Sequence, residues 1–323
     1  MKKGIYILVF VILIIVALLV YLSDHTSTFA RSFKGFELEE KEEVTSIALK
    51  TVEHEVELKK QSENNWTANE QYRARLERVE QLLDIAGLVE IVSPAAQENQ
   101  NELRREIQEK GTWVCFHEGN RELLSYYLYQ KGGRIFAMAD PHGVIYILRI
   151  IDFKGNVNDF FNANPNLWRN RVVFDYEPQQ INSVDVEYKN QPTVSFRIRN
   201  NHDGSFELFA YPGKENVRDF DPTRIARYLS YFRVLKYEKV VEQLSWEEQQ
   251  EILQKEPEAR IAVTDGKGNT QELAVYPRPM SGNPSQKDVY RAYGRINQSD
   301  ELVVIQFYIF DPILKEINYF RSE

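Results

Sequence analysis

The sequence predicts an α+β fold: an N-terminal transmembrane helix followed by two repeated halves, each a mainly antiparallel sheet with helices packed on one face. Three observations predict it: an apolar segment at residues 5–22, a pattern that recurs at a constant offset, and alternation of apolar and polar residues in both copies. The expected parts are a transmembrane anchor (1–23), a stalk and lead-in strand (24–43), a first α+β repeat (44–165) and a second (166–323).

The anchor is predicted from eighteen consecutive apolar residues, 5–22, preceded by Lys2 and Lys3. At about 1.5 Å per residue they would span roughly 27 Å, close to the hydrocarbon core of a bilayer. The run is longer than the apolar part of a cleaved signal peptide, and no small-x-small site closes it. Because flanking lysines favour the cytoplasmic side, we expect a single-pass protein of the inner (cytoplasmic) membrane. Its N-terminus would be cytoplasmic and its bulk a periplasmic or other extracytoplasmic domain of the cell envelope.

Composition restricts the partners. The formal net charge of −8 is a poor match for nucleic acid, so no nucleic-acid partner is expected. The single cysteine, Cys115, rules out an intrachain disulfide, so the fold must be held by core packing and strand pairing.

The internal repeat starts with strand-like residues 44–49, whose pattern returns at 181–186. Farther along, the copies keep an offset of 149 residues, so that Arg75 matches Arg224 and Arg78 matches Arg227. The apolar residues around these arginines recur at spacings of three and four, which predicts an amphipathic helix in each copy. Asp221 followed by proline is a typical start for the second of these helices.

The rest of each copy is predicted to hold a further helix and then strands. The further helices are expected at residues 100–110 and 245–255, the latter because Ser245 and Glu248 form a capping-box pattern. Turns at 119–120 and 266–269 predict hairpins, and alternation over 302–309 predicts a strand. The join between the halves is expected within residues 162–178.

Chemistry-bearing patterns are sparse. The five histidines are isolated in sequence, and Cys115 and His117 would point to the same face of one strand. This pair is open to interpretation as metal ligands, but a buried structural cysteine beside a polar strand residue is the favoured reading. A hydrolase would need His117 or His142 beside a carboxylate in a pocket. We therefore expect no catalytic residue, no metal ligand and no cofactor, and hence no enzyme.

The chain resembles a family of bacterial envelope proteins, the domain of unknown function 4340 family. The resemblance covers nearly the whole chain, and its most specific parts surround Trp168 and Tyr228. The residues that carry it are the Lys-rich apolar start, 27–29, 44–49, Trp66, 72–75, 167–174, 181–184 and 227–232. It implies a single-pass envelope protein with no established activity, often encoded beside ABC transporter components.

The expected function is that of a membrane-anchored accessory or assembly protein that performs no catalysis and docks on an integral-membrane complex, with an ABC-type permease as the suspected partner. The alternative is a binding module for a glycan or another cell-envelope ligand in a groove between the repeats, since aromatic side chains can stack on sugars. The residues expected to make interactions, or contacts between the repeats, are Trp168, Arg169, Arg171, Tyr228 and Tyr231.

Overall fold

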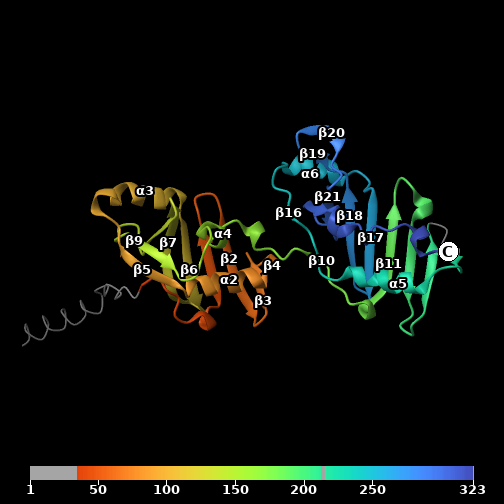
Figure 1. The fold of residues 1–323 in the computed structure, drawn as a ribbon, viewed down its shortest axis with the longest axis horizontal. Coiled ribbons are helices and arrows are strands. Elements are labelled where there is room, and N and C mark those ends of the chain that lie inside the picture. The colour runs from red at the N-terminus through yellow and green to blue at the C-terminus, as the bar shows by residue number, and fades with distance from the viewer. Residues whose placement is uncertain (1–34, 212–214, 323) are drawn as a thin grey trace, which may run out of the picture. The chain divides into compact units, whose positions relative to one another are not determined.

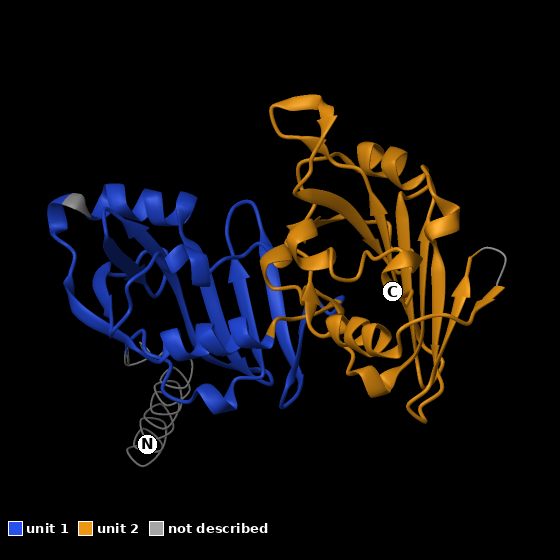
Figure 2. Cartoon of the chain, turned by 45° about the vertical axis from the view of Figure 1, so that its right-hand side comes forward, with its two compact units in different colours: residues 1–71, 76–164 blue, residues 72–75, 165–323 orange. Residues whose placement is uncertain are grey.

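The computed structural model describes residues 35–211 and 215–322, which form two compact units (Figures 1 and 2). The first comprises the chain up to residue 71 together with 76–164. The second comprises 72–75 and the chain from 165 onward. The chain thus changes units between Asn164 and Pro165, and the short segment 72–75 is part of the second unit although it lies within the first half of the sequence.

The first unit is built on one large sheet, with helices between its strands (Figure 1). Its elements are η1 (Lys41–Glu43), β1 (Ser46–Lys50), β2 (Glu55–Ser62), β3 (Asn65–Ala68), α2 (Leu76–Ala86), β5 (Val89–Pro94), η2 (Gln97–Asn99), α3 (Gln100–Lys110), β6 (Thr112–Glu118), β7 (Arg121–Lys131), β8 (Arg134–Met138), β9 (Tyr146–Ile150) and α4 (Val157–Phe160).

The second unit holds a second large sheet and two small two-stranded ones. Its elements are β4 (Tyr72–Arg73), η3 (Pro165–Leu167), β10 (Val172–Phe174), η4 (Pro178–Gln180), β11 (Ile181–Tyr188), η5 (Pro192–Val194), β12 (Phe196–Asn200), β13 (Phe206–Ala210), β14 (Glu215–Val217), α5 (Pro222–Leu229), η6 (Ser230–Phe232), β15 (Leu235–Lys236), β16 (Lys239–Val240), α6 (Trp246–Leu253), β17 (Ala259–Asp265), β18 (Thr270–Tyr276), β19 (Pro279–Met280), β20 (Asn283–Lys287), β21 (Arg291–Ile296), β22 (Val303–Gln306), α7 (Phe307–Phe310) and η7 (Ile317–Phe320).

The two large sheets share one strand order. The first runs β3-β2-β1-β6-β7-β8-β9-β5, and the second runs β13-β12-β11-β17-β18-β21-β22-β16 with β14 beside β13. Neighbouring strands in both pair antiparallel. Each sheet therefore begins as a three-stranded meander and continues through a strand that follows a helix.

Strand residues alternate between core and surface, as the sequence pattern requires. In β1, Ile47 and Leu49 are fully buried while the residues between them are not, and in β11 Val184 and Val186 behave in the same way. Successive side chains of a strand point to opposite faces, so each apolar set lies on one face of its sheet.

The helices start where local signals predict them. Asp221 caps α5 by accepting from the Thr223 backbone N–H at 2.8 Å, with proline at the first helical position. Ser245 and Glu248 form the expected capping box of α6. The helix predicted at 100–110 is confirmed as α3, and the hairpins predicted at 119–120 and 266–269 are confirmed as β6–β7 and β17–β18.

The predicted α+β fold class needs correction, because two large antiparallel sheets dominate the described chain. Helices α2 and α3 have eleven residues each, about 16 Å of helix, far short of a bilayer core of about 30 Å. Nowhere in the described parts of the chain is a helix long and apolar enough to cross a membrane. The structure therefore does not uphold the predicted single-pass, inner-membrane localisation. Residues 5–22, on which that prediction rested, lie outside the described residues.

The prediction that helices cover one face of each sheet is wrong for the second unit. In β18, Leu273 and Val275 belong to a core with α5, whereas Ala274 and Tyr276 belong to a separate core with Ile252 of α6. Alternate residues of one strand lie on opposite faces, so helices pack on both. The physical reason is that both sets of side chains in β18 are apolar.

Two further predictions from the sequence differ from the structure over short segments. Residues 302–309 do not form one strand: β22 ends at Gln306 and α7 begins at Phe307. A short apolar run suits a strand and a buried helix equally well. In the segment 24–43 no lead-in strand appears among the described residues 35–43, which hold only the 3-10 helix η1.

Candidate functional site

The second unit contains a pocket of about 500 Å³, within the range of small-ligand sites. Its lining combines tyrosines, charged and amide side chains, and branched aliphatic residues, all from the second unit. These residues are Tyr72, Arg73, Arg169, Asn170, Val172, Val173, Asp175, Tyr176, Tyr237, Gln271, Ile296, Ser299, Glu301 and Val303.

One wall of the pocket forms where segment 72–75 lies along residues 168–170. The Arg75 backbone N–H donates to the Trp168 carbonyl at 2.7 Å, and the Asn170 N–H donates to the Arg73 carbonyl at 2.7 Å. Ala74 and Arg169 form an isolated antiparallel bridge between these two bonds. The pairing brings Tyr72 and Arg73 to the same wall as Arg169 and Asn170.

Arg169 is the charged group of this wall with the most contacts to neighbouring side chains. Its Nη2 donates to Glu301 Oε2 at 2.8 Å, and its Nη1 donates to Asn166 Oδ1 at 3.2 Å. Its Cζ lies 3.6 Å from the centroid of the Tyr72 ring, a cation–π contact, and the Tyr72 hydroxyl donates to Glu301 Oε1 at 3.4 Å. Its side chain is only 12% exposed, and these partners fix its orientation.

The charges of the lining balance. Arg73 and Arg169 are opposed by Asp175 and Glu301, and the last of these is already paired with Arg169. Burial raises the pKa of Tyr237, so its hydroxyl stays neutral at physiological pH. The pocket therefore presents hydrogen-bonding groups and apolar surface without a net charge.

Two more of the five residues singled out from the sequence are Trp168 and Arg171, which flank the residues of this wall in the chain. The Trp168 side chain is fully buried. Arg171 donates from Nη1 to the Glu238 carbonyl at 2.6 Å, and its own carbonyl accepts from the Tyr237 N–H at 2.9 Å. Neither residue lines the pocket. Of Trp168, Arg169 and Arg171, only Arg169 does.

Tyr228 and Tyr231 belong to the core beneath the second sheet. Tyr228 is fully buried, and its hydroxyl donates to the Ile313 carbonyl at 2.9 Å. Its ring packs edge-on against Phe232 and Phe320. Tyr231 is half-buried against the same core. The structure thus brings Trp168, Arg169 and Arg171 together in one segment and places the two tyrosines in a packing role.

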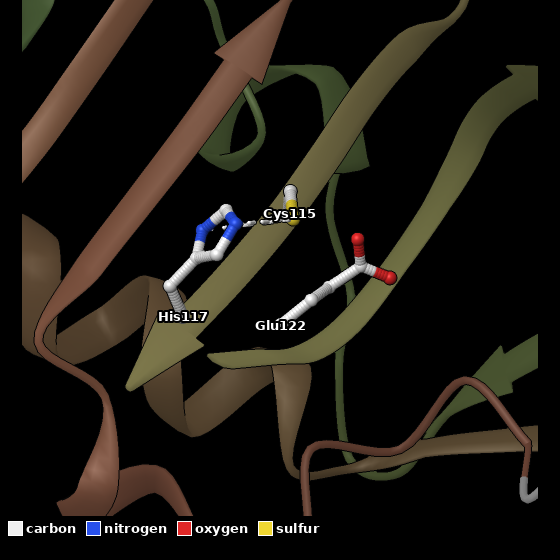
Figure 3. Close-up of side chains that lie close together, drawn as sticks. All are labelled: Cys115, His117 and Glu122. Atoms are coloured by element: carbon white, nitrogen blue, oxygen red, sulfur yellow. Dashed lines mark hydrogen bonds between the residues drawn. The ribbon is translucent and has the colours of Figure 1, made fainter. Parts of the chain in front are cut away.

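A second cluster lies in the first unit, where Cys115, His117 and Glu122 meet on one face of strands β6 and β7 (Figure 3). The Cys115 Sγ lies 3.7 Å from His117 Nδ1 and 3.5 Å from Nε2. Cys115 is buried, while His117 and Glu122 are half-buried. His142, the other histidine considered for chemistry, is exposed in a turn where its backbone N–H donates to Asp140 Oδ1 at 2.9 Å.

Sequence reasoning missed Tyr72 and Glu301 of the pocket and Glu122 of the cluster. Tyr72 and Glu301 are 229 residues apart in the chain, so no local spacing relates them. Glu122 does follow the predicted turn at 119–120, and counting residues across that hairpin is the one signal that could have placed it near His117.

The comparisons with known proteins add no relative. No protein-family model matches the chain, and no curated protein is similar to it in sequence. The resemblance noted from the sequence therefore stays a prediction, and the function is argued from the geometry of the two sites.

Proposed function

We propose that this chain is a non-enzymatic binding protein whose second unit holds a neutral, hydroxyl-rich ligand of the glycan class in the pocket around Arg169. The observation that carries the proposal is the composition of the lining: tyrosine rings and aliphatic side chains beside amide and hydroxyl groups, two charges of each sign, and an arginine that is already paired with a glutamate. Sugars present apolar C–H faces that stack on aromatic rings and hydroxyls that both donate and accept hydrogen bonds.

Tyr176 is the ring best placed to stack, because it lines the pocket and is only half-buried. Asn170 and Gln271 supply amide donors and acceptors nearby. Glu301 already accepts from Arg169, so an anionic ligand would have to compete with Glu301 for the guanidinium. A neutral ligand avoids that competition, which favours glycan over phosphate or nucleotide.

The test is a saturation-transfer NMR screen of the full chain with maltotriose, cellotriose and chitotriose, and with glucose 6-phosphate as the anionic comparison. Transfer to at least one neutral trisaccharide, with none to the phosphorylated sugar, is the expected result. Transfer only to the phosphorylated sugar, or to no sugar, overturns the proposal.

A second candidate function is that of an accessory protein that docks on a partner complex, and an exposed patch favours it. Val289, Tyr290 and Tyr308 are 65%, 68% and 89% exposed, and they lie together at a depression of about 480 Å³. Exposed aromatic side chains are enriched at protein interfaces. The partner proposed from the family resemblance is an ABC-type transporter.

This candidate is tested by affinity purification of the tagged full chain from its native cells, read by mass spectrometry, with a Tyr290→Ala/Tyr308→Ala variant alongside. Recovery of a permease or ATPase with the wild-type chain, and its loss with the variant, is expected. Recovery of the wild-type chain alone contradicts docking.

A further inference from the structure

We propose that Cys115, His117 and Glu122 form a binding site for a zinc ion in the first unit. The proposal is independent of the pocket in the second unit, because it shares no residue with it. Thiolate, imidazole and carboxylate are the three side-chain ligand types that zinc takes in proteins, and here one of each converges on one sheet face.

The Cys115 sulfur and the His117 ring lie close enough for one zinc ion to join them. A tetrahedral ion with a Zn–S bond of about 2.3 Å and a Zn–N bond of about 2.0–2.1 Å holds sulfur and nitrogen about 3.5–3.6 Å apart. The Cys115 Sγ lies 3.5 Å from His117 Nε2 and 3.7 Å from Nδ1. Because the sulfur is almost equally far from both nitrogens, the imidazole ring must turn to direct one of them at the ion. The ligand atoms of all three residues lie within 4.8 Å of one another, so a rotation of the Glu122 side chain closes the remaining distance.

The hairpin turn and a β-bulge together place the carboxylate. Regular pairing from the turn at 119–120 puts Glu122 opposite His117. Farther along, Cys115 pairs with Ser125, because the register shifts by one residue between Phe116 and His117. Bulges re-aim side chains and are over-represented next to functional sites.

Small side chains flank the cluster, and a hydrogen bond orients its carboxylate. On the neighbouring strand β1, the residues opposite His117 and Cys115 are Ser46 and Ala48, both small. The Ser125 hydroxyl donates to Glu122 Oε1 at 2.9 Å, which orients the carboxylate. Such supporting hydrogen bonds tune the affinity of metal sites. Figure 3 shows the His117 ring turned toward Cys115 while Glu122 reaches over from strand β7.

The chemical types of the three ligands favour zinc over other divalent ions. A thiolate favours zinc over magnesium and calcium, which prefer all-oxygen sites. Three protein ligands leave the fourth tetrahedral position for a water molecule.

The test uses the full chain after treatment with a chelator. Zinc is added by equilibrium dialysis and counted by elemental analysis, and cobalt(II) is added to a second sample as a spectroscopic probe. One zinc per chain and a cobalt–thiolate charge-transfer absorption are expected. A wild-type chain that retains no zinc, or a cobalt complex without thiolate absorption, overturns the proposal.

Variants assign the ligands. His117→Ala and Glu122→Gln should each weaken zinc binding by at least about tenfold, and the exposed His142→Ala is the matched control with unchanged affinity. Glu122→Gln keeps the acceptor for Ser125, and both ligand variants change half-buried residues, so they test the site without emptying the core. Cys115→Ala should abolish the thiolate absorption, with circular dichroism to verify that it folds. Zinc affinity unchanged in His117→Ala and Glu122→Gln contradicts the proposal.

Discussion

Arg169 and Glu301 form a 2.8 Å ion pair that is partly withdrawn from water, with the arginine side chain 12% and the glutamate side chain 42% exposed. The chain also contains an exposed counterpart. Arg199 pairs with Glu207 at 3.0 Å, its side chain is 53% exposed, and its Cζ lies 5.5 Å from the Phe209 ring. The two arginines thus make the same kinds of contact at different depths.

Replacing Arg169 by alanine should therefore cost more stability than the same change at Arg199. We expect Arg169→Ala to lower the free energy of unfolding by about 1–2 kcal/mol, because it removes hydrogen bonds made by a mostly buried charge. Arg199→Ala should cost less than about 0.5 kcal/mol, as is typical of exposed pairs. Urea unfolding of both variants measures the difference, and equal losses would contradict the structural role given to Arg169.

Two buried tyrosines should respond in opposite directions to removal of the hydroxyl. The Tyr126 O–H is buried and has no acceptor among the described residues, whereas the Tyr228 O–H donates to the Ile313 carbonyl at 2.9 Å. Burial raises the pKa of both groups, so both remain protonated at neutral pH. Tyr126→Phe should stabilise the fold by about 1 kcal/mol, and Tyr228→Phe should destabilise it by about 1 kcal/mol. Destabilisation by Tyr126→Phe would mean that its hydroxyl has a partner.

Gly111 tests the close approach of α3 to the sheet. A Cβ at this position would lie 2.4 Å from the Ile107 carbonyl oxygen and 3.0 Å from that of Leu128, both backbone atoms. Gly111→Ala should cost about 1–3 kcal/mol through overpacking. Gly266 is the control, because nothing lies within 4 Å of a Cβ built there. Thermal unfolding of the two variants gives the comparison, and a Gly111→Ala variant as stable as Gly266→Ala would contradict the packing.

Glu238 should make stability depend on pH in the acid range. A hydrogen bond from the Arg291 side chain at 2.6 Å, aided by one from Gln306 at 2.9 Å, lowers the pKa of Glu238 despite the opposing effect of burial. A lowered folded-state pKa stabilises the fold above the unfolded-state pKa of about 4.3, and this stability is lost as pH falls through the folded-state pKa. Glu238→Gln should flatten that part of the stability profile. The exposed Glu53→Gln is the control and should leave the pH dependence of stability unchanged. If Glu238→Gln also leaves the loss of stability at acid pH unchanged, the proposed contribution of Glu238 is contradicted.

Elements governed by neighbouring residues could be predicted from the sequence. The starts of α5 and α6 depend on Asp221 and Ser245, whose side chains bond to backbone groups two or three residues away. The shared strand order also has a sequence counterpart in the matching helical patterns of the two copies: Arg75 directly precedes α2, and its counterpart Arg224 lies in the first turn of α5. The capping hydrogen bonds of Asp221 and Ser245 join residues within one helical turn, so they can be predicted without knowing the tertiary structure.

Features that depend on distant pairing could not be predicted in the same way. The partnership of Tyr72 with Glu301 arises only when segment 72–75 joins the second unit. The β-bulge between Phe116 and His117 leaves no mark in the apolar pattern, although the turn at 119–120 does put Glu122 opposite His117. The segment 302–309 is predicted as one strand, yet it changes to helix at Phe307, because tertiary packing decides between the two for a short apolar run.

The measurement that tests the proposed function most directly is isothermal titration of the trisaccharide with the strongest NMR response against three full-length proteins: wild type, Tyr176→Ala and Tyr308→Ala. Tyr176 lines the pocket, whereas Tyr308 is an exposed tyrosine that does not. Loss of the stacking ring should weaken binding about tenfold, equivalent to about 1.4 kcal/mol, while Tyr308→Ala should bind as wild type does. Equal affinity of Tyr176→Ala and wild type would contradict glycan binding in this pocket.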